Sequence, residues 1–261
     1  MCSAINTLIH PSAQIDPSTV IHPGCIIGEG VVIGPQCEIG PNAVIVKDTV
    51  IGARNRIHPF ASVGGDSQHK SYAGQPTKLI MGDDNVVREC VTINRGDPVG
   101  GNLTRIGHRN LFMAYSHVAH DAVIGNDVVV VNHANIAGHV QVDDHVVVGA
   151  YVGIAQFCHI GQHAFLTMGA GVSKDVLPFT NVTYVPAIVR GINIVGLKRR
   201  GFNGDDIAAI KQTYRLIFGG QDQSQLAALA KESASARSMI EFWRSSEKGL
   251  VIPKKSHLHE A

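Results

Sequence analysis

Aliphatic residues stand six positions apart along most of this chain, and that period constrains the fold more than any other feature. They form three blocks, which are Ile9, Ile15, Ile21, Ile27, Ile33, Ile39, Ile45, Ile51, Ile57 and Val63; then Met81, Val87 and Ile93; then Ile106, Phe112, Val118, Ile124, Val130, Ile136, Val142, Val148, Ile154, Ile160, Leu166 and Val172. A hexapeptide period with one inward aliphatic residue is typical of a parallel β-helix. With three faces to a coil, the 25 repeats predict about eight coils of about 18 residues each.

A second slot, four residues after each aliphatic position, usually holds a small side chain. Its occupants include Ala13, Thr19, Cys25, Val31, Cys37, Ala43, Ala134, Cys158, Ala164 and Ala170. We expect both slots to face inward, which makes the buried cysteines small core residues. The slot directly after the aliphatic residue is often Gly or the His of an IHP triplet, which indicates a corner between short strands.

The period defines the domain organisation. The pattern resembles that of the hexapeptide-repeat proteins, whose β-helix is left-handed, in contrast to the usual right-handed crossover. We therefore expect an all-β chain with an α-helical C-terminal tail. The left-handed β-helix would occupy residues 1–182, with loop insertions near 64–79 and 97–105, and a C-terminal helical domain would occupy 183–261. Asn203 or Asp205 is the expected N-cap of its main helix, and residues 223–246 should supply further helical segments.

Charge and cysteine usage exclude several classes of function. The formal net charge of +1 argues against bulk binding of nucleic acid. The five cysteines, at positions 2, 25, 37, 90 and 158, form no CxxC pair, and the opening MCSAINTL has neither a basic region nor a long apolar run. We expect a reduced, cytoplasmic protein with no membrane span.

The stretch AYSHVAHDAVIG places polar side chains on this aliphatic scaffold. The period turns His120 and Asp121 outward, and an offset of 18 residues stacks Gly138 and His139 on them, with Gln156 next. A neutral imidazole beside a carboxylate can accept a proton, and a glycine N–H can stabilise an oxyanion. Three other interpretations stay open: solvated surface histidines, a zinc site of the carbonic-anhydrase type, or a structural protein without catalysis.

Five segments, HVAHD, AGHVQVDD, RECVTINRG, SYAGQPTK and GINIVGLKRRGF, resemble the UDP-N-acetylglucosamine O-acyltransferase family of lipid A biosynthesis. The resemblance implies transfer of an acyl chain from acyl carrier protein to the 3-hydroxyl of UDP-N-acetylglucosamine. It also implies a homotrimer with active sites between neighbouring prisms. The phosphopantetheine thioester of the carrier would be a co-substrate, with no cofactor and no metal. The related N-acyltransferase carries an additional N-terminal domain, which we do not expect because the repeats begin by Ile9.

The resemblance assigns roles to individual residues. His120 would be the general base, Asp121 would orient it, and the N–H of Gly138 would form the oxyanion hole. Substrate contacts would come from His117, His139, Gln156, Gln68 and Lys70, with Asn193, Arg199 and Arg200 near the nucleotide and the phosphopantetheine. Met168 matches the family's hydrocarbon ruler, which implies a hydroxyacyl chain of about ten carbons, because a large side chain stops a longer one.

Several positions depart from the family pattern. Ala155 and Pro186 stand where His is usual, and Val195 stands where Glu is usual. In addition, HKSY replaces DLKY, which puts Ser71 at the Lys position with Lys70 one place earlier, and Asn94 replaces the His of TIHRG. The acceptor therefore stays open between UDP-N-acetylglucosamine and a related 3-amino sugar nucleotide, and a divergent paralogue with weak activity is the third alternative.

Overall fold

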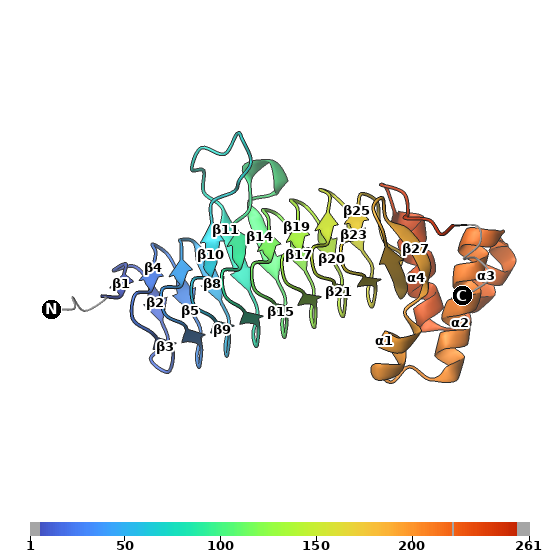
Figure 1. Cartoon of the computed structure of the whole chain (residues 1–261), viewed down its shortest axis with the longest axis horizontal. Helices are drawn as coiled ribbons and strands as arrows, with labels where there is room; N and C mark the ends of the chain where they lie inside the picture. Colours follow the sequence, from blue (N-terminus) through green and yellow to red (C-terminus); the bar gives the residue numbers. More distant parts are fainter. Residues whose placement is uncertain (1–5, 221, 255–261) are drawn as a thin grey trace.

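Each sequence repeat forms one short strand, and three strands complete one coil of an elongated left-handed β-helix (Figure 1). The computed structural model describes residues 6–220 and 222–254. Strands β1 to β25 coincide with the 25 repeats, as the period predicts. Cys2 lies outside the described residues, and the four described cysteines are free.

The strands form three parallel sheets, one on each face of the prism. The first sheet contains β1 (Leu8–Ile9), β4 (Ile26–Ile27), β7 (Val44–Ile45), β10 (Ser62–Gly65), β13 (Thr92–Asn94), β16 (His117–Val118), β19 (Asn135–Ile136), β22 (Gly153–Ile154) and β25 (Gly171–Val172). The second contains β2 (Gln14–Ile15), β5 (Val32–Ile33), β8 (Thr49–Ile51), β11 (Lys78–Met81), β14 (Leu103–Ile106), β17 (Val123–Ile124), β20 (Gln141–Val142) and β23 (His159–Ile160).

The third sheet is extended by a hairpin at its C-terminal end. It contains β3 (Val20–Ile21), β6 (Glu38–Ile39), β9 (Arg56–Ile57), β12 (Val86–Val87), β15 (Leu111–Phe112), β18 (Val129–Val130), β21 (Val147–Val148), β24 (Phe165–Leu166), β26 (Thr180–Thr183) and β27 (Ile188–Ile192). β26 pairs in parallel with β24, whereas β27 pairs antiparallel with β26. The expected domain boundary at residues 182/183 therefore falls inside this hairpin, and we propose that the helical part begins at Ile194.

The core is a narrow column of branched and small side chains. The aliphatic slots from Ile27 to Val172 are buried, and so are the small slots, including Cys25, Cys37 and Cys158. The first coil differs, because Leu8 and Ile9 are 61% and 48% exposed with no coil beyond them. Pairing offsets are 18 residues in regular coils, as in Asn135 with Gly153.

Most corners of the prism have a left-handed residue at the third position after the aliphatic residue, such as Gln36, Asn42 and Asp121, with φ of 58°, 57° and 56°. The glycine directly after the aliphatic residue, which the sequence predicts to mark a corner, is required for another reason. Neighbouring coils approach each other too closely there for a side chain. A Cβ on Gly34 would lie 2.9 Å from the backbone of Gly52 in the next coil.

Two loops leave the prism on the same side near β10, β11 and β14 (Figure 1). The fully buried Arg95 joins them, because its guanidinium donates to the Gly64 carbonyl and to the Asp66 carboxylate of the first loop. The second loop contains a short 3-10 helix, η1 (Pro98–Gly100), which Asp97 caps by accepting the Val99 N–H. The hydroxyl of Ser67 donates to the same Asp97 carboxylate at 2.8 Å.

The C-terminal end carries four helices, α1 (Ile194–Arg199), α2 (Gly204–Gly219), α3 (Gln223–Glu232) and α4 (Ala234–Ser245). Asn203 is the N-cap of α2, with a reciprocal capping box to Asp206, so the sequence prediction for this helix is confirmed. The helices predicted in 223–246 are confirmed as well. Among the described residues, no helix combines the length and the apolar character needed to cross a membrane.

Candidate active site

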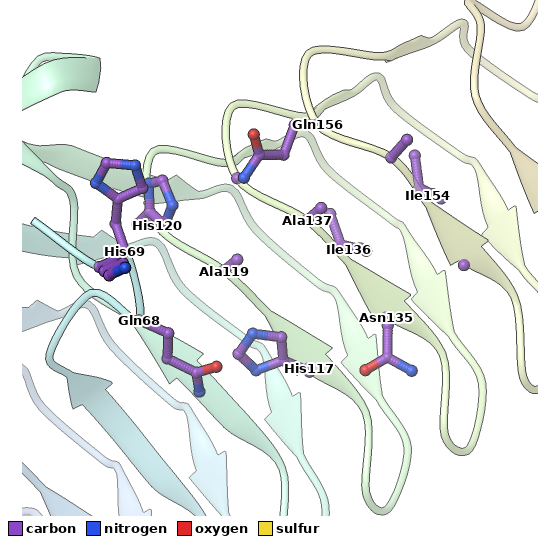
Figure 2. Close-up of a pocket in the computed structure, with 14 residues that line it drawn as sticks. Gln68, His69, His117, Ala119, His120, Asn135, Ile136, Ala137, Ile154 and Gln156 are labelled. Atoms are coloured by element: carbon purple, nitrogen blue, oxygen red, sulfur yellow. The ribbon is translucent and has the colours of Figure 1, made fainter.

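A cleft of about 520 Å³ lies on the first sheet beside the two loops (Figure 2). Its walls are the outward slots of β16, β19 and β22 and the first loop. The lining residues are Gln68, His69, Lys70, His117, Ala119, His120, Asn135, Ile136, Ala137, Gly138, Gly153, Ile154, Ala155 and Gln156. Six residues that the resemblance assigns to catalysis or substrate binding therefore share one cavity, namely Gln68, Lys70, His117, His120, Gly138 and Gln156.

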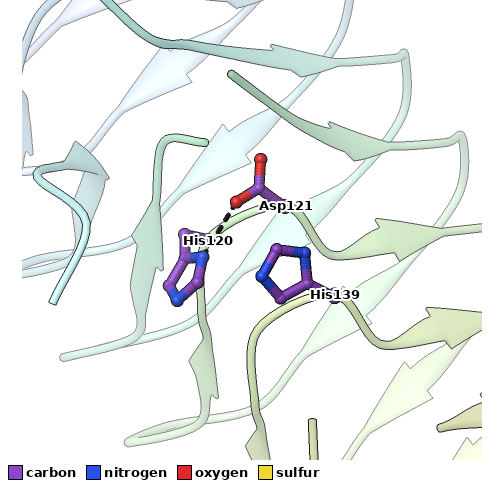
Figure 3. Close-up of side chains that lie close together, drawn as sticks. All are labelled: His120, Asp121 and His139. Carbon is purple, nitrogen blue, oxygen red and sulfur yellow. Dashed lines mark hydrogen bonds and ion pairs between the residues drawn. The ribbon is translucent and has the colours of Figure 1, made fainter. Parts of the chain in front are cut away.

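His120 and Asp121 form a hydrogen-bonded pair at the corner that follows β16 (Figure 3). The Nδ1 atom of His120 lies 2.8 Å from Oδ2 of Asp121. Oδ2 also accepts the Asp97 N–H at 2.9 Å, and Oδ1 accepts the Leu103 N–H at 3.3 Å. Because a carboxylate only accepts hydrogen bonds, it places the imidazole proton on Nδ1 and leaves Nε2 as a base.

The outward direction that the period predicts for this pair does not expose it to solvent. His120 and Asp121 point outward from the prism, but they are only 4% and 6% exposed. The second loop covers them, and it approaches so closely that a Cβ on Gly100 would lie 2.3 Å from Cγ of Asp121. The same Cβ would lie 2.3 Å from Cε1 of His139, so only glycine fits there.

The stacking predicted from the 18-residue offset is present. The ring of His139 meets that of His120 edge-on, with centroids 5.0 Å apart, and stacks on Phe157 at 4.4 Å. A Cβ on Gly138 would lie 2.6 Å from Cε1 of His120. The imidazole therefore occupies the space that any other residue at 138 would need.

The backbone N–H of Gly138 has no acceptor among the described residues. The reason is its place in the repeat, two residues after the aliphatic position, where in the regular coils the N–H makes no backbone–backbone bond between coils. The same slot holds proline in the N-terminal coils, at positions 11, 17, 23, 35, 41 and 59. Gly138 lines the cleft, so its unpaired backbone N–H is available to donate a hydrogen bond to an oxyanion.

Burial keeps the neighbouring imidazoles uncharged. It lowers the pKa of His117 and of His139, and the positive potential of His120 lowers that of His117 further. His117 is oriented by the Thr92 hydroxyl, 2.7 Å from Nδ1. Burial alone would raise the pKa of Asp97, but the Val99 N–H and the Ser67 hydroxyl hold it below its usual range.

The remaining predicted residues lie elsewhere in the chain. Arg199 and Arg200 line a second cleft of about 490 Å³, together with Val147, Phe165, Asn181, Asn193, Val195 and Gly196. The Asn193 amide is used within the chain, because Oδ1 accepts the Gly196 N–H and Nδ2 donates to the His163 carbonyl. Met168 is 74% exposed at the corner between β24 and β25, on the opposite edge of the first sheet from His120.

Two residues that organise the site were missed from the sequence, Arg95 and Asp97. They flank Gly96 directly after β13, at the point where the chain leaves the prism. The sequence signal that could have identified them is the presence of charged residues directly after a buried strand.

The same residues also form a possible metal site. His120, Asp121 and His139 each offer one ligand atom, and these atoms lie within 4.8 Å of one another. Both oxygens of Asp121 and Nδ1 of His120 already make hydrogen bonds. A metal would compete with these bonds, so the arrangement favours proton transfer over metal binding.

Known proteins share both the repeats and the C-terminal region. Residues 175–251 match the family model of domain 2 of UDP-N-acetylglucosamine O-acyltransferase, and residues 6–41, 31–65 and 103–138 match the bacterial transferase hexapeptide model. The acyl-(acyl-carrier-protein)–UDP-N-acetylglucosamine O-acyltransferase of Xanthomonas axonopodis pv. citri is 47% identical over 256 residues, covering 94% of this chain and 97% of the relative. The chain belongs to the UDP-N-acetylglucosamine O-acyltransferase family. It is therefore an enzyme of the acyltransferase class.

Solved structures of this family have the same architecture. The UDP-N-acetylglucosamine acyltransferase of Francisella novicida has a TM-score of 0.92 at 36% identity, covering 96% of this chain and 94% of the other. The UDP-N-acetylglucosamine O-acyltransferase of Moraxella catarrhalis has a TM-score of 0.91 at 35% identity, covering 94% and 98%.

The departures from the family pattern have distinct surroundings. Ala155 lines the first cleft, and Val195 lines the second and is 62% exposed. Pro186 lies in the turn between β26 and β27. Asn94 is buried, and its Nδ2 donates to the Asp66 carbonyl at 2.7 Å, so it fixes the first loop. Ser71 bonds to His69.

Proposed function

We propose that this chain transfers a 3-hydroxyacyl group from acyl carrier protein to the 3-hydroxyl of UDP-N-acetylglucosamine, the first step of lipid A biosynthesis, with His120 as general base. The observation that carries the proposal is the His120–Asp121 pair, joined at 2.8 Å beside Gly138 in the cleft. The names of relatives such as that of Xanthomonas axonopodis pv. citri support the acceptor and the donor.

The reaction uses the free Nε2 of His120. This nitrogen takes the proton of the acceptor hydroxyl while the oxygen attacks the thioester carbonyl carbon. The new O–C bond forms, the carbonyl becomes an oxyanion, and the C–S bond then breaks with its electron pair on sulfur. The proton held by His120 passes to that sulfur, which regenerates the base and releases the carrier thiol. Asp121 stabilises the transient imidazolium through Nδ1–H.

The oxyanion is assigned to the N–H of Gly138. Removing one preorganised donor from such a site typically costs about 100- to 1000-fold in kcat. The lack of a side chain at 138 lets the carbonyl oxygen approach that donor beside His120.

The substrates and the assembly are part of the same proposal. The relatives' names support acyl carrier protein and a UDP-sugar as substrates. The homotrimer that the family resemblance implies would explain why Arg199 and Arg200 lie outside the His120 cleft, since the second cleft of one subunit could then border the His120 cleft of another. Arginine pairs with pyrophosphate through two hydrogen bonds. The reaction as proposed needs no cofactor, and its nucleotide and carrier substrates favour the cytoplasm.

Met168 is the proposed limit on acyl length. In a single chain, Met168 is 74% exposed and lies at the edge of the first sheet. An acyl chain of about ten carbons that extends from the cleft along this sheet would end against it.

The test is acyl transfer by wild-type protein and by His120→Ala, monitored by mass spectrometry of the nucleotide product. The expected loss in kcat is about 100- to 10,000-fold, because a general base is removed. The chain offers a matched control in His159, whose Nε2 lies 2.8 Å from Asp143 outside the first cleft. His159→Ala should retain transfer. Activity retained in His120→Ala would contradict the assignment of the base.

The second candidate is a metal-dependent prism, favoured by the cluster of His120, Asp121 and His139. Elemental analysis of purified protein distinguishes the two. Stoichiometric zinc, together with loss of activity on chelation, would favour the metal site.

A further inference from the structure

A second carboxylate lies beside the His120–Asp121 pair. Asp97 stands at the start of the second loop, is 1% exposed, and donates its backbone N–H to Oδ2 of Asp121 at 2.9 Å. That same oxygen lies 2.8 Å from Nδ1 of His120 (Figure 3). The proposed mechanism uses the carboxylate of Asp121 alone, so it gives no role to the charge of Asp97.

Uncharged groups hold the Asp97 side chain. Its Oδ1 accepts the Val99 N–H at 3.1 Å, and its Oδ2 accepts the Ser67 hydroxyl at 2.8 Å. Among the described residues, no lysine or arginine nitrogen lies within 4 Å of this carboxylate, and Nδ1 of His69 approaches it to 3.8 Å. The hydrogen bonds therefore fix the carboxylate without neutralising it.

These contacts keep Asp97 ionised. Burial raises the pKa of its carboxyl group, but the Val99 N–H, the Ser67 hydroxyl and the positive potential of His120 together hold the pKa below its usual range. The attraction between two charges acts on both of them. The charge of Asp97 therefore stabilises a protonated His120, and it does so in a site from which water is largely excluded.

The buried cation closest to Asp97 in the chain is already engaged. Arg95 donates to the carboxylate of Asp66 in the first loop. Asp97 and Asp121 thus place two negative charges beside one imidazole, and these charges repel each other while His120 is neutral. A proton on His120 relieves that repulsion.

We propose that Asp97 is a positioning residue whose negative charge stabilises the imidazolium that His120 becomes when it takes the proton of the acceptor. Asp97 does not line the first cleft, so it acts through the His120–Asp121 pair and not on the substrate. It neither gains nor loses a proton, and the bonds that form and break are those of the mechanism above. This inference rests on the proposed function, since it adds a second charge to the general base of that reaction.

The test removes the charge and keeps the shape. In Asp97→Asn, Oδ1 can still accept the Val99 N–H, and Nδ2 can donate to the Ser67 hydroxyl, which accepts as well as it donates. We expect kcat to fall about 10- to 30-fold and KM for UDP-N-acetylglucosamine to stay within about 2-fold, because the charge acts only when the proton has moved. Asp97→Ser keeps an oxygen that caps the Val99 N–H and should lower kcat similarly, so it tests the charge even if the asparagine variant does not fold.

Ser67→Ala separates the charge from the anchoring of the first loop. It removes the hydroxyl that joins this loop to Asp97 but leaves the carboxylate in place. Since Gln68 and Lys70 of the same loop line the cleft, we expect KM to rise and kcat to stay within about 2-fold. A purely structural role of Asp97 would give the same result in Asp97→Asn.

Asp175 provides a matched control with the same pattern of hydrogen bonds. It is 4% exposed, its Oδ1 accepts the His159 N–H at 2.8 Å, and its Oδ2 accepts the Ser246 hydroxyl at 2.7 Å. It lies three coils beyond Asp121 in the same column of corners, about 14 Å away at about 4.8 Å for each coil. Asp175→Asn should therefore change neither kcat nor KM.

The outcomes separate the two levels of the proposal. An unchanged kcat in Asp97→Asn and Asp97→Ser, a rise in KM alone, or an equal fall of kcat in Asp175→Asn would overturn the role of Asp97. Absence of transfer by the wild-type protein would overturn the proposed function itself.

Discussion

The first and second clefts have similar volumes, about 520 and 490 Å³, but their chemistry differs. The first presents the imidazoles of His117 and His120 and the idle N–H of Gly138, next to residues of the first loop. The second presents Arg199 at the end of α1 and Arg200 directly after it, beside the apolar side chains of Val147 and Phe165. On the proposed mechanism, one chain keeps the general base and the two arginines in separate clefts, and assembly of subunits would have to bring them together.

The charges of the two clefts indicate different tasks. Burial lowers the pKa of the Arg200 guanidinium, against the opposing influence of the Asp127 carboxylate. A partly desolvated cation of this kind is stabilised by a bound anion. Burial lowers the pKa of His117, which lines the first cleft, and of the neighbouring His139, which favours the uncharged form that hydrogen-bonds to an uncharged reacting group.

The largest predicted difference between the clefts comes from Gly138→Ala. The added Cβ would lie within 2.7 Å of Nε2 of His120, so the imidazole must move and the oxyanion donor is obstructed. We expect kcat to fall about 100-fold or more while the melting temperature changes little. Gly204 on α2, whose Cβ would meet nothing within 4 Å and which does not line the first cleft, provides the control Gly204→Ala. Equal effects of the two substitutions would show that the proposed crowding at His120 is wrong.

His163 supports the second cleft and gives a prediction for pH. Burial lowers its pKa from the usual 6.5 to about 4, and its Nδ1 has no hydrogen-bond partner among the described residues. The unfolded chain binds this proton more readily, so its stabilising effect is complete above about pH 6.5 and is lost as pH falls toward 4. His163→Phe keeps the ring between Phe179 and Phe202 without a titrating group.

Chemical denaturation at pH 7 and near pH 4 measures this effect. We expect wild type to lose on the order of 2–3 kcal/mol more than His163→Phe over that interval. Parallel losses in the two proteins would mean that His163 is not the source.

Arg200→Ala should affect binding rather than chemistry. If the second cleft anchors the nucleotide, KM for the UDP-sugar rises about 10-fold and kcat stays within about 2-fold, because the interaction is equal in ground and transition states. The exposed Lys198 lies on the same helix but lines neither cleft, so Lys198→Ala is the control. A fall in kcat with unchanged KM would instead place Arg200 in the chemical step.

Met168→Gly should produce the smallest change and should leave both clefts intact. We expect the preferred acyl chain to lengthen, with a change of a few-fold in relative rates, since hydrophobic pockets discriminate weakly between methylenes. Competition between carrier proteins loaded with graded acyl chains measures the optimum. The same optimum in wild type and variant would reject Met168 as the ruler.

The sequence predicted the parts of this molecule that depend on the period. The aliphatic column, the stacking of His139 on the His120 corner and the N-cap at Asn203 all follow from local pattern and fixed offset. Burial of His120 did not follow, because the loop that covers it is positioned by distant contacts of Arg95 and Asp97.

The spacing of the repeats could not predict the second cleft either. Its residues come from β21, β24, β26 and α1, and no repeat relates Arg200 to Val147. The capping bonds of Asn193 also depend on how α1 meets the end of the prism.

The parallel register between coils has an evolutionary consequence. Every regular coil presents the same backbone to its neighbour, so a whole coil of 18 residues can be gained or lost without a new kind of junction. Such a change before the first loop would alter only the length of the molecule. Between His120 and Gly138 it would separate the base from its oxyanion donor. The N-terminal coils are therefore free to vary in number, whereas the coils that hold the site must be inherited as a block.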